Sequence, residues 1–105
     1  VNLGSGGAAI NGTYQSGVTL NAPGLYPNGA GNSADFDGVN DRILIPDSPL
    51  INTAAIAQRT IELVFNADNA GGARQVLWEE GGNTNALNIY IEGGQIYFNI
   101  RDAGD

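Results

Sequence analysis

Tyrosine, asparagine and arginine side chains alternate with apolar residues between positions 88 and 101. Tyr90 and Tyr97 supply aromatic faces, and Asn88, Asn99 and Arg101 supply hydrogen-bonding groups beside them. A sugar ring presents an apolar C–H face and a rim of hydroxyls, which such side chains can match. These residues are therefore candidate ligand contacts. The alternative is that the tyrosines reflect only the ordinary preference of aromatic residues for strands.

A second candidate site is the loop from Glu79 to Asn85, which combines carboxylates and amides with glycine. Glu80, Asn83 and Asn85 carry the hard oxygen atoms that Ca²⁺ prefers. The EF-hand spacing is absent from the loop. The alternative is a simple hairpin loop, because glycine and asparagine are also common turn residues.

A third candidate site is the segment Phe36-Asp37-Gly38-Val39-Asn40-Asp41. Asp37 and Asp41 could hold a cation, so they join the candidate ligands for Ca²⁺. The alternative is that these side chains accept hydrogen bonds from their own backbone in Asx-turns. Ca²⁺ is the one cofactor that the sequence suggests.

The inventory of side chains disfavours catalysis. The chain contains no histidine and no cysteine, which excludes Ser-His-Asp triads, thiolate nucleophiles and zinc–thiolate sites. A retaining glycosidase needs two carboxylates about 5 Å apart on one surface. Glu79 and Glu80 are adjacent, so on a strand they point to opposite faces, and Glu62 has no acidic partner in its own segment. We predict no catalytic residues and no enzymatic activity.

The charge balance excludes one class of partner. Eleven acids against four arginines, with no lysine, give a net charge of −7. The arginines are scattered singly, whereas nucleic-acid binding needs a clustered basic surface. No apolar run approaches the length of a membrane span. A signal peptide is also missing, so we expect a mature or excised segment.

The sequence predicts the strands and the turn that position the first site more definitely than any other element of the chain. Gly93-Gly94 suits a two-residue turn whose central residues both need positive φ. That turn pairs Glu92 with Gln95, Ile91 with Ile96, Tyr90 with Tyr97, Ile89 with Phe98, Asn88 with Asn99, and Leu87 with Ile100. Because opposed residues share a face, one face is apolar and the other carries the tyrosines and amides. We predict an antiparallel sheet with one core face and one solvent face.

The rest of the chain predicts short strands and turns, as expected with sixteen glycines. Strands are predicted at 17–20, 42–45, 61–66 and 75–79, and a short helical turn at 51–57. Gly38 is expected to have positive φ in the turn before the second of these strands. Pro46 ends that strand, because proline donates no hydrogen bond to a ladder. The predicted fold class is all-β.

The segment from Phe36 to Ser48 resembles the opening of laminin-G-like domains, which belong to the concanavalin-A-like lectin–glucanase superfamily. The shared pattern is Phe-Asp-Gly-x-x-Asp, then a short strand and the turn Pro46-Asp47-Ser48. Gly12-Thr13-Tyr14 and Gly17-Val18-Thr19-Leu20 are similar to the family's approach to this motif. The resemblance implies an antiparallel β-sandwich of jelly-roll type, whose concave sheet often forms a ligand groove.

The resemblance also implies that the domain is incomplete within this chain. Residues 1–33 would form a Gly/Asn-rich lead-in with a short strand, and residues 34–105 the first part of the sandwich. A complete jelly roll needs about eight strands. The missing strands would come from the rest of the polypeptide or from another chain. Related pentraxin-type domains place an Asp-Asn pair where this chain has Thr84-Asn85, so only Asn85 carries over.

The resemblance implies a non-catalytic carbohydrate-binding or adhesion module of a secreted or cell-surface protein, and we expect a bacterial one. Its partner would be a glycan or another cell-surface ligand. The alternative is a structural β-sandwich subunit of an assembly, completed by strands from another chain and without a small ligand. Oligomers that depend on concentration, and not on sugars or calcium chelation, would favour this alternative.

Overall fold

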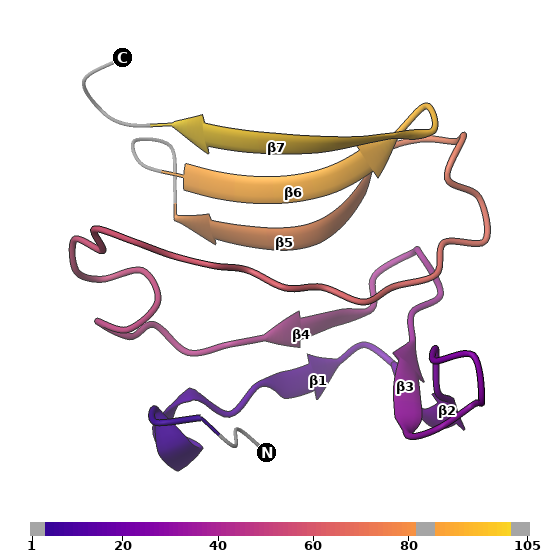
Figure 1. The fold of residues 1–105 in the computed structure, drawn as a ribbon, viewed down its shortest axis with the longest axis horizontal. Coiled ribbons are helices and arrows are strands. Elements are labelled where there is room, and N and C mark those ends of the chain that lie inside the picture. Colours follow the sequence, from indigo (N-terminus) through magenta and orange to yellow (C-terminus); the bar gives the residue numbers. More distant parts are fainter. Residues whose placement is uncertain (1–3, 82–85, 102–105) are drawn as a thin grey trace. The chain divides into compact units, whose positions relative to one another are not determined.

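The computed structural model describes residues 4–81 and 86–101 (Figure 1). The chain divides into two compact units, Val1–Val64 and Phe65–Asp105. Apart from one short 3-10 helix, the regular elements of the described residues are antiparallel strands, which confirms the all-β class. In the part of the chain that the structure covers, no helix is long and apolar enough to cross a membrane.

The first unit holds two small antiparallel strand pairs. β1 (Thr13–Gln15) pairs with β4 (Arg42–Leu44), and η1 (Gly7–Ile10) precedes β1. β2 (Thr19–Pro23) pairs with β3 (Asn32–Asp35). The register of β2 shifts at Asn21, whose φ is 63°. Asparagine tolerates this left-handed conformation better than most residues, which explains why the bulge lies there.

A turn after β4 is organised around Ser48, which is 8% exposed. Its carbonyl oxygen accepts hydrogen bonds from the N–H groups of Ile51, Asn52 and Thr53. The side chain of Asn52 accepts a hydrogen bond from Ser48 N–H and donates one to Asp47. The helical turn predicted at 51–57 therefore lies earlier, over 48–53, because these side chains satisfy the backbone there.

Three predicted strands have different limits, and one is absent. β2 spans Thr19–Pro23 rather than 17–20, and β4 ends at Leu44 rather than at 45. The strand predicted at 75–79 extends to Gly81. Residues 61–66 form no strand, although the apolar residues Ile61, Leu63 and Phe65 recur there with the two-residue period of a strand. A strand also needs a neighbour that completes its ladder of hydrogen bonds, and no described segment pairs with these residues.

The second unit is a three-stranded antiparallel sheet in the order β5-β6-β7 (Figure 1). β5 spans Gln75–Gly81, β6 spans Ala86–Glu92 and β7 spans Gln95–Arg101. The register of β6 and β7 is the predicted one throughout. Gly93 and Gly94 have φ values of 58° and 79°, as the predicted two-residue turn requires. The hairpin and its two faces are confirmed.

β5 carries a bulge that the sequence pattern does not reveal. Val76 lies opposite Tyr90, but Trp78 lies opposite Ile89, so Leu77 is the extra residue. One extra residue reverses the alternation of the side chains beyond it. The bulge therefore places Trp78 on the apolar face of the sheet.

Few apolar side chains are buried among the described residues. Tyr90 is 9% exposed and Ile91 is 3% exposed, and both lie on β6. Every residue of the edge strand β7 is exposed, with Ile96, Phe98 and Ile100 at 65%, 57% and 68%. The apolar face is thus buried at Ile91 on the central strand and solvent-exposed along β7.

Replacing Gly93 by alanine should lower the free energy of unfolding by about 1 kcal/mol. The cause is conformational, because a Cβ disfavours a φ of 58° although no other group lies within 4 Å of it. Gly93→Asn is the matched control, since asparagine is common at this turn position, and its stability should be nearly unchanged. Urea denaturation measures both differences. Equal losses for the two variants would contradict the assigned turn.

Candidate functional site

The predicted ligand residues lie together on one face of the β5–β7 sheet. Asn88 and Tyr90 come from β6, and Tyr97, Asn99 and Arg101 come from β7. The register puts Tyr90 opposite Tyr97 and Asn88 opposite Asn99. Opposed residues point to the same side of a sheet. These residues therefore form one surface, which we call the polar face.

The two tyrosine rings of the polar face form a stack that a cation extends. The ring centroids of Tyr90 and Tyr97 are 4.9 Å apart, and the interplanar angle is 12°. The guanidinium carbon of Arg74, the residue before β5, lies 4.2 Å from the centroid of the Tyr90 ring. Because β6 lies between β5 and β7, Arg74 and Tyr97 cover opposite sides of Tyr90. Tyr90 is consequently 9% exposed, whereas Tyr97 is 37% exposed.

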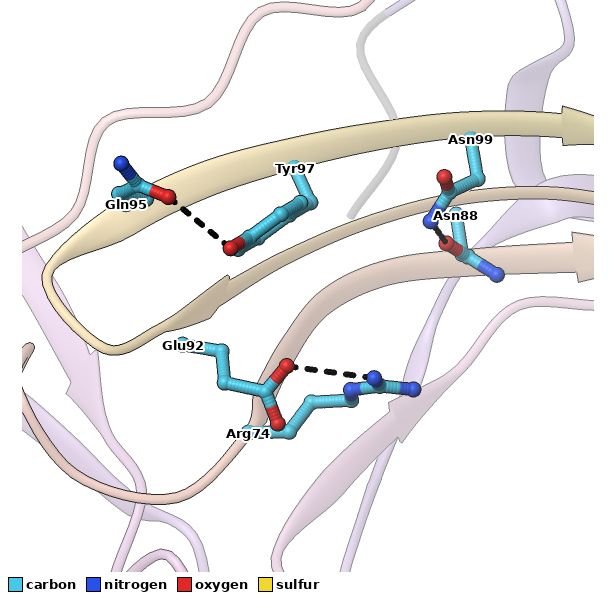
Figure 2. Close-up of polar contacts among 6 residues, drawn as sticks. All are labelled: Arg74, Asn88, Glu92, Gln95, Tyr97 and Asn99. Atoms are coloured by element: carbon cyan, nitrogen blue, oxygen red, sulfur yellow. Dashed lines mark hydrogen bonds and ion pairs between the residues drawn. The ribbon is translucent and has the colours of Figure 1, made fainter.

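Arg74 is held over the Tyr90 ring by Glu92, the last residue of β6. Arg74 Nη2 donates a hydrogen bond to Glu92 Oε2 at 3.2 Å (Figure 2). An exposed ion pair of this kind contributes about 0–1 kcal/mol, so its main effect is to orient the guanidinium. Together with the cation–π contact, it fixes Arg74 on the stack.

Arg74 is a site residue that no pattern in the sequence predicts. Its place follows from the register of β5 and β6, in which Gln75 lies opposite Ile91. Continuing that ladder by one residue brings Arg74 beside Glu92. The signal that would have found Arg74 is therefore the register of β5 and β6, which includes the extra residue Leu77.

Hydrogen bonds order the remaining side chains of the polar face (Figure 2). Asn99 Nδ2 donates to Asn88 Oδ1 at 3.1 Å, and Tyr97 Oη donates to Gln95 Oε1 at 3.0 Å. The contact between the two asparagines uses only part of their hydrogen-bonding capacity. Asn88 Nδ2 remains as a donor and Asn99 Oδ1 as an acceptor, so the pair presents both kinds of group side by side.

The second candidate site lies only partly within the described residues, because Asn83 and Asn85 are outside them. Glu80 lies in β5 opposite Leu87, and Glu79 lies opposite Asn88. The two glutamates are therefore on opposite faces, as predicted, and Glu80 shares the apolar face. Calcium binding by this loop stays a prediction.

The carboxylates of the third candidate site contact their own loop. Asp37 Oδ1 accepts hydrogen bonds from Val39 N–H at 2.8 Å and from Asn40 N–H at 3.4 Å. Asp41 Oδ2 accepts one from Asp37 N–H at 3.1 Å, and Gly38 has the predicted positive φ, at 72°. The Asx-turn considered as the alternative is thus present. Within residues 4–81 and 86–101, no three acidic residues gather into a group that could hold a metal ion.

The fold and the polar face define an all-β protein whose antiparallel sheet displays stacked tyrosines and paired amides. Comparison with protein families, curated proteins and solved structures finds no match to this chain. The geometry of the polar face is therefore the basis on which a function can be assigned.

Proposed function

We propose that the polar face binds carbohydrate, in a non-catalytic recognition module of a secreted or cell-surface protein. The observation that carries the proposal is the stack of Arg74, Tyr90 and Tyr97. It ends in a tyrosine ring that is 37% exposed and lies on the edge strand β7. Such a ring offers the flat apolar surface on which the C–H face of a sugar can stack.

In this proposal Tyr97 is the ligand contact and Tyr90 is its support. Both sides of the Tyr90 ring are covered, one by Arg74 and the other by Tyr97, so no sugar can stack on it. The stack holds Tyr97 in one orientation before a ligand arrives. Pre-organisation of this kind lowers the entropy cost of binding. The hydrogen bond from Tyr97 Oη to Gln95 restrains the same ring at its far end.

The amide pair beside Tyr97 would supply the polar contacts. Asn99 follows Tyr97 by two residues on β7 and therefore lies about 7 Å along the same face. Its hydrogen bond to Asn88 keeps both amides in place. Their remaining donor and acceptor suit two neighbouring hydroxyl groups. A sugar stacked on Tyr97 would bring its hydroxyls within reach of this pair.

The charges favour a neutral sugar. Arg74 is already paired with Glu92 at 3.2 Å, and Arg101 lies at the end of β7. The whole chain carries a net charge of −7, so an anionic glycan would meet long-range repulsion. We therefore expect recognition of hydroxyl groups rather than of carboxylates or sulfates.

The finer fold is part of the same proposal. We infer that the three sheets are the first part of a laminin-G-like jelly-roll sandwich, with a lead-in over residues 1–33 and the domain proper from residue 34. In support, all strand pairs are antiparallel, and the apolar face of the third sheet is open along β7. A sandwich covers such a face with a second sheet.

Replacing Tyr97 by alanine should weaken glycan binding about tenfold, because the stacking surface is lost. Tyr97→Phe keeps the ring and loses only the hydrogen bond to Gln95, so it should retain most of the affinity. Tyr26→Ala is the matched control, since Tyr26 is 62% exposed and lies outside the polar face. An array of neutral and anionic glycans, followed by calorimetry with the best binder, measures these effects.

Two outcomes would count against the proposal. One is a chain that binds no glycan on the array, and the other is unchanged affinity in Tyr97→Ala. Arg74→Ala adds a check on the supporting role of the stack. It should reduce affinity only about two- to fivefold, because the Tyr97 ring remains while its cationic support is removed.

A further inference from the structure

β7 is an edge strand without the devices that usually protect an edge. It is seven residues long, it contains no proline and no bulge, and its one charge is Arg101 at the end. The apolar side chains that alternate along it are between 57% and 68% exposed. Edge strands tend to pair with other strands unless charge, proline or a bulge prevents it.

The other edge of the same sheet is protected. β5 contains the bulge between Val76 and Trp78 and two adjacent acids, Glu79 and Glu80. Two copies of β5 side by side would bring these acids close together, on a chain whose net charge is already −7. If two copies associate edge to edge through this sheet, β7 is therefore the strand through which they pair.

The hairpin turn determines which backbone N–H and C=O groups of β7 are not hydrogen-bonded to β6. A two-residue turn places a hydrogen-bonded pair next to it, and such pairs alternate with non-hydrogen-bonded pairs along the ladder. Since Glu92 and Gln95 form the first pair, the backbone groups of Ile96, Phe98 and Ile100 point away from β6. Within the described residues no further strand pairs with β7.

We propose that β7 pairs in antiparallel fashion with β7 of a second copy of this chain, about a two-fold axis at Phe98. In this register Phe98 faces its own copy, Ile96 faces Ile100, Tyr97 faces Asn99, and Gln95 faces Arg101. Every backbone group that points away from β6 then enters a hydrogen-bonded pair, and apolar residues meet apolar residues. The order of side-chain types in β7 is the same in both directions, so the strand is complementary to itself.

The charges of β7 also favour this register. Arg101 of the second copy comes to lie opposite Gln95, and Gln95 lies opposite Glu92 on β6. The two arginines are thus at opposite ends of the paired strands, each near an acid. The three-stranded sheet of each copy joins its partner in one continuous sheet.

This inference does not depend on the proposed sugar binding, although the two uses of β7 compete. Pairing brings Asn99 of the second copy beside the outer side of the Tyr97 ring, where the sugar is proposed to stack. The dimer is therefore measured without sugar, and failure of either proposal leaves the other standing.

Sedimentation equilibrium of the unaltered chain should show a monomer–dimer equilibrium, and hydrogen exchange followed by NMR should locate the contact. On dimerisation the exchange rates of the amides of Ile96, Phe98 and Ile100 should fall at least about tenfold. Those of Tyr97 and Asn99, which bond to β6, should be protected at every concentration. A chain that stays monomeric, or a dimer whose Phe98 amide is no better protected than in the monomer, would overturn the proposal.

Phe98→Lys places like charges against each other at the two-fold axis and should abolish the dimer. Leu44→Lys is the control, because Leu44 is 55% exposed but lies on β4, and it should leave the dimer intact. Gln95→Lys guards against a misfolded Phe98 variant, because its cation lies opposite Glu92 of the same hairpin. That cation also lies opposite Arg101 of the second copy and should weaken the dimer about twofold, whereas an unchanged or tighter dimer would contradict the register.

Discussion

Replacing Ile91 by alanine should lower the free energy of unfolding by about 2–4 kcal/mol. Ile91 is 3% exposed and lies on β6, the central strand of its sheet. The substitution removes buried carbon atoms and leaves a cavity that the surroundings fill only in part. Because few apolar side chains are buried among the described residues, this loss is a large share of the stability of a small domain. Urea denaturation measures it.

Ile96→Ala is the matched control for this substitution. Ile96 lies directly opposite Ile91 on the same sheet face, but it is 65% exposed. Its truncation should cost less than about 1 kcal/mol, at a protein concentration low enough to keep the chain monomeric. Similar losses for the two variants would show that the apolar face is equally buried at β6 and β7, contrary to the structure.

Gly24→Ala should destabilise the β2–β3 pair by about 1–3 kcal/mol. A Cβ on Gly24 would overlap the carbonyl oxygen of Ala30, and it would lie 2.7 Å from the carbonyl carbon of Ala30 and 2.8 Å from the carbonyl oxygen of Gly31. All of these are backbone atoms, so the methyl group fits only if the loop moves. Ser33 Oγ donates a hydrogen bond to the Pro23 carbonyl at 2.9 Å, which ties the loop close to the strands and opposes that movement.

Thermal unfolding, together with hydrogen exchange at the opposed residues Leu20 and Ala34, would measure the loss in Gly24→Ala. Gly29→Asn is the control in the same loop. Gly29 has a φ of 66°, and no other group lies within 4 Å of an added Cβ, so asparagine should be accepted. If both variants proved equally stable, the close approach of the backbone at Gly24 would be wrong.

The hairpin of β6 and β7 could be predicted in full from the sequence. Gly93-Gly94 selects a turn through the backbone sterics of two residues, and the alternation on either side agrees with one register only. β2 and β4 could be located but not delimited. The limits of a strand depend on its partner, and β3, the partner of β2, has no pattern of its own in the residues 32–35.

Residues 61–66 show why alternation alone is an insufficient guide. Ile61, Leu63 and Phe65 recur there with the period of a strand, yet no strand forms and no described segment pairs with these residues. Alternation expresses which side of a sheet each residue would prefer. Whether a ladder exists depends on a second segment elsewhere in the chain, which a local pattern does not contain.

The candidate site could be predicted as a set of residues but not as a geometry. That Tyr90, Tyr97 and the two asparagines share a face follows from the hairpin register. The place of Arg74 over Tyr90 does not follow from it, because β5 is positioned by a register that contains the bulge at Leu77. The third strand therefore decides which tyrosine is covered and which remains open.

Residues close together in the sequence were enough to define one hairpin, its turn and its polar and apolar faces. The backbone sterics of Gly93-Gly94 and the two-residue alternation of the flanking side chains are both local properties, and they specify the same register. Only the tertiary structure decided that Tyr97 stays exposed, that β7 is an open edge and that Trp78 lies on the apolar face. These features depend on where β5 pairs with β6 and on one extra residue in that pairing, and no local pattern predicts either.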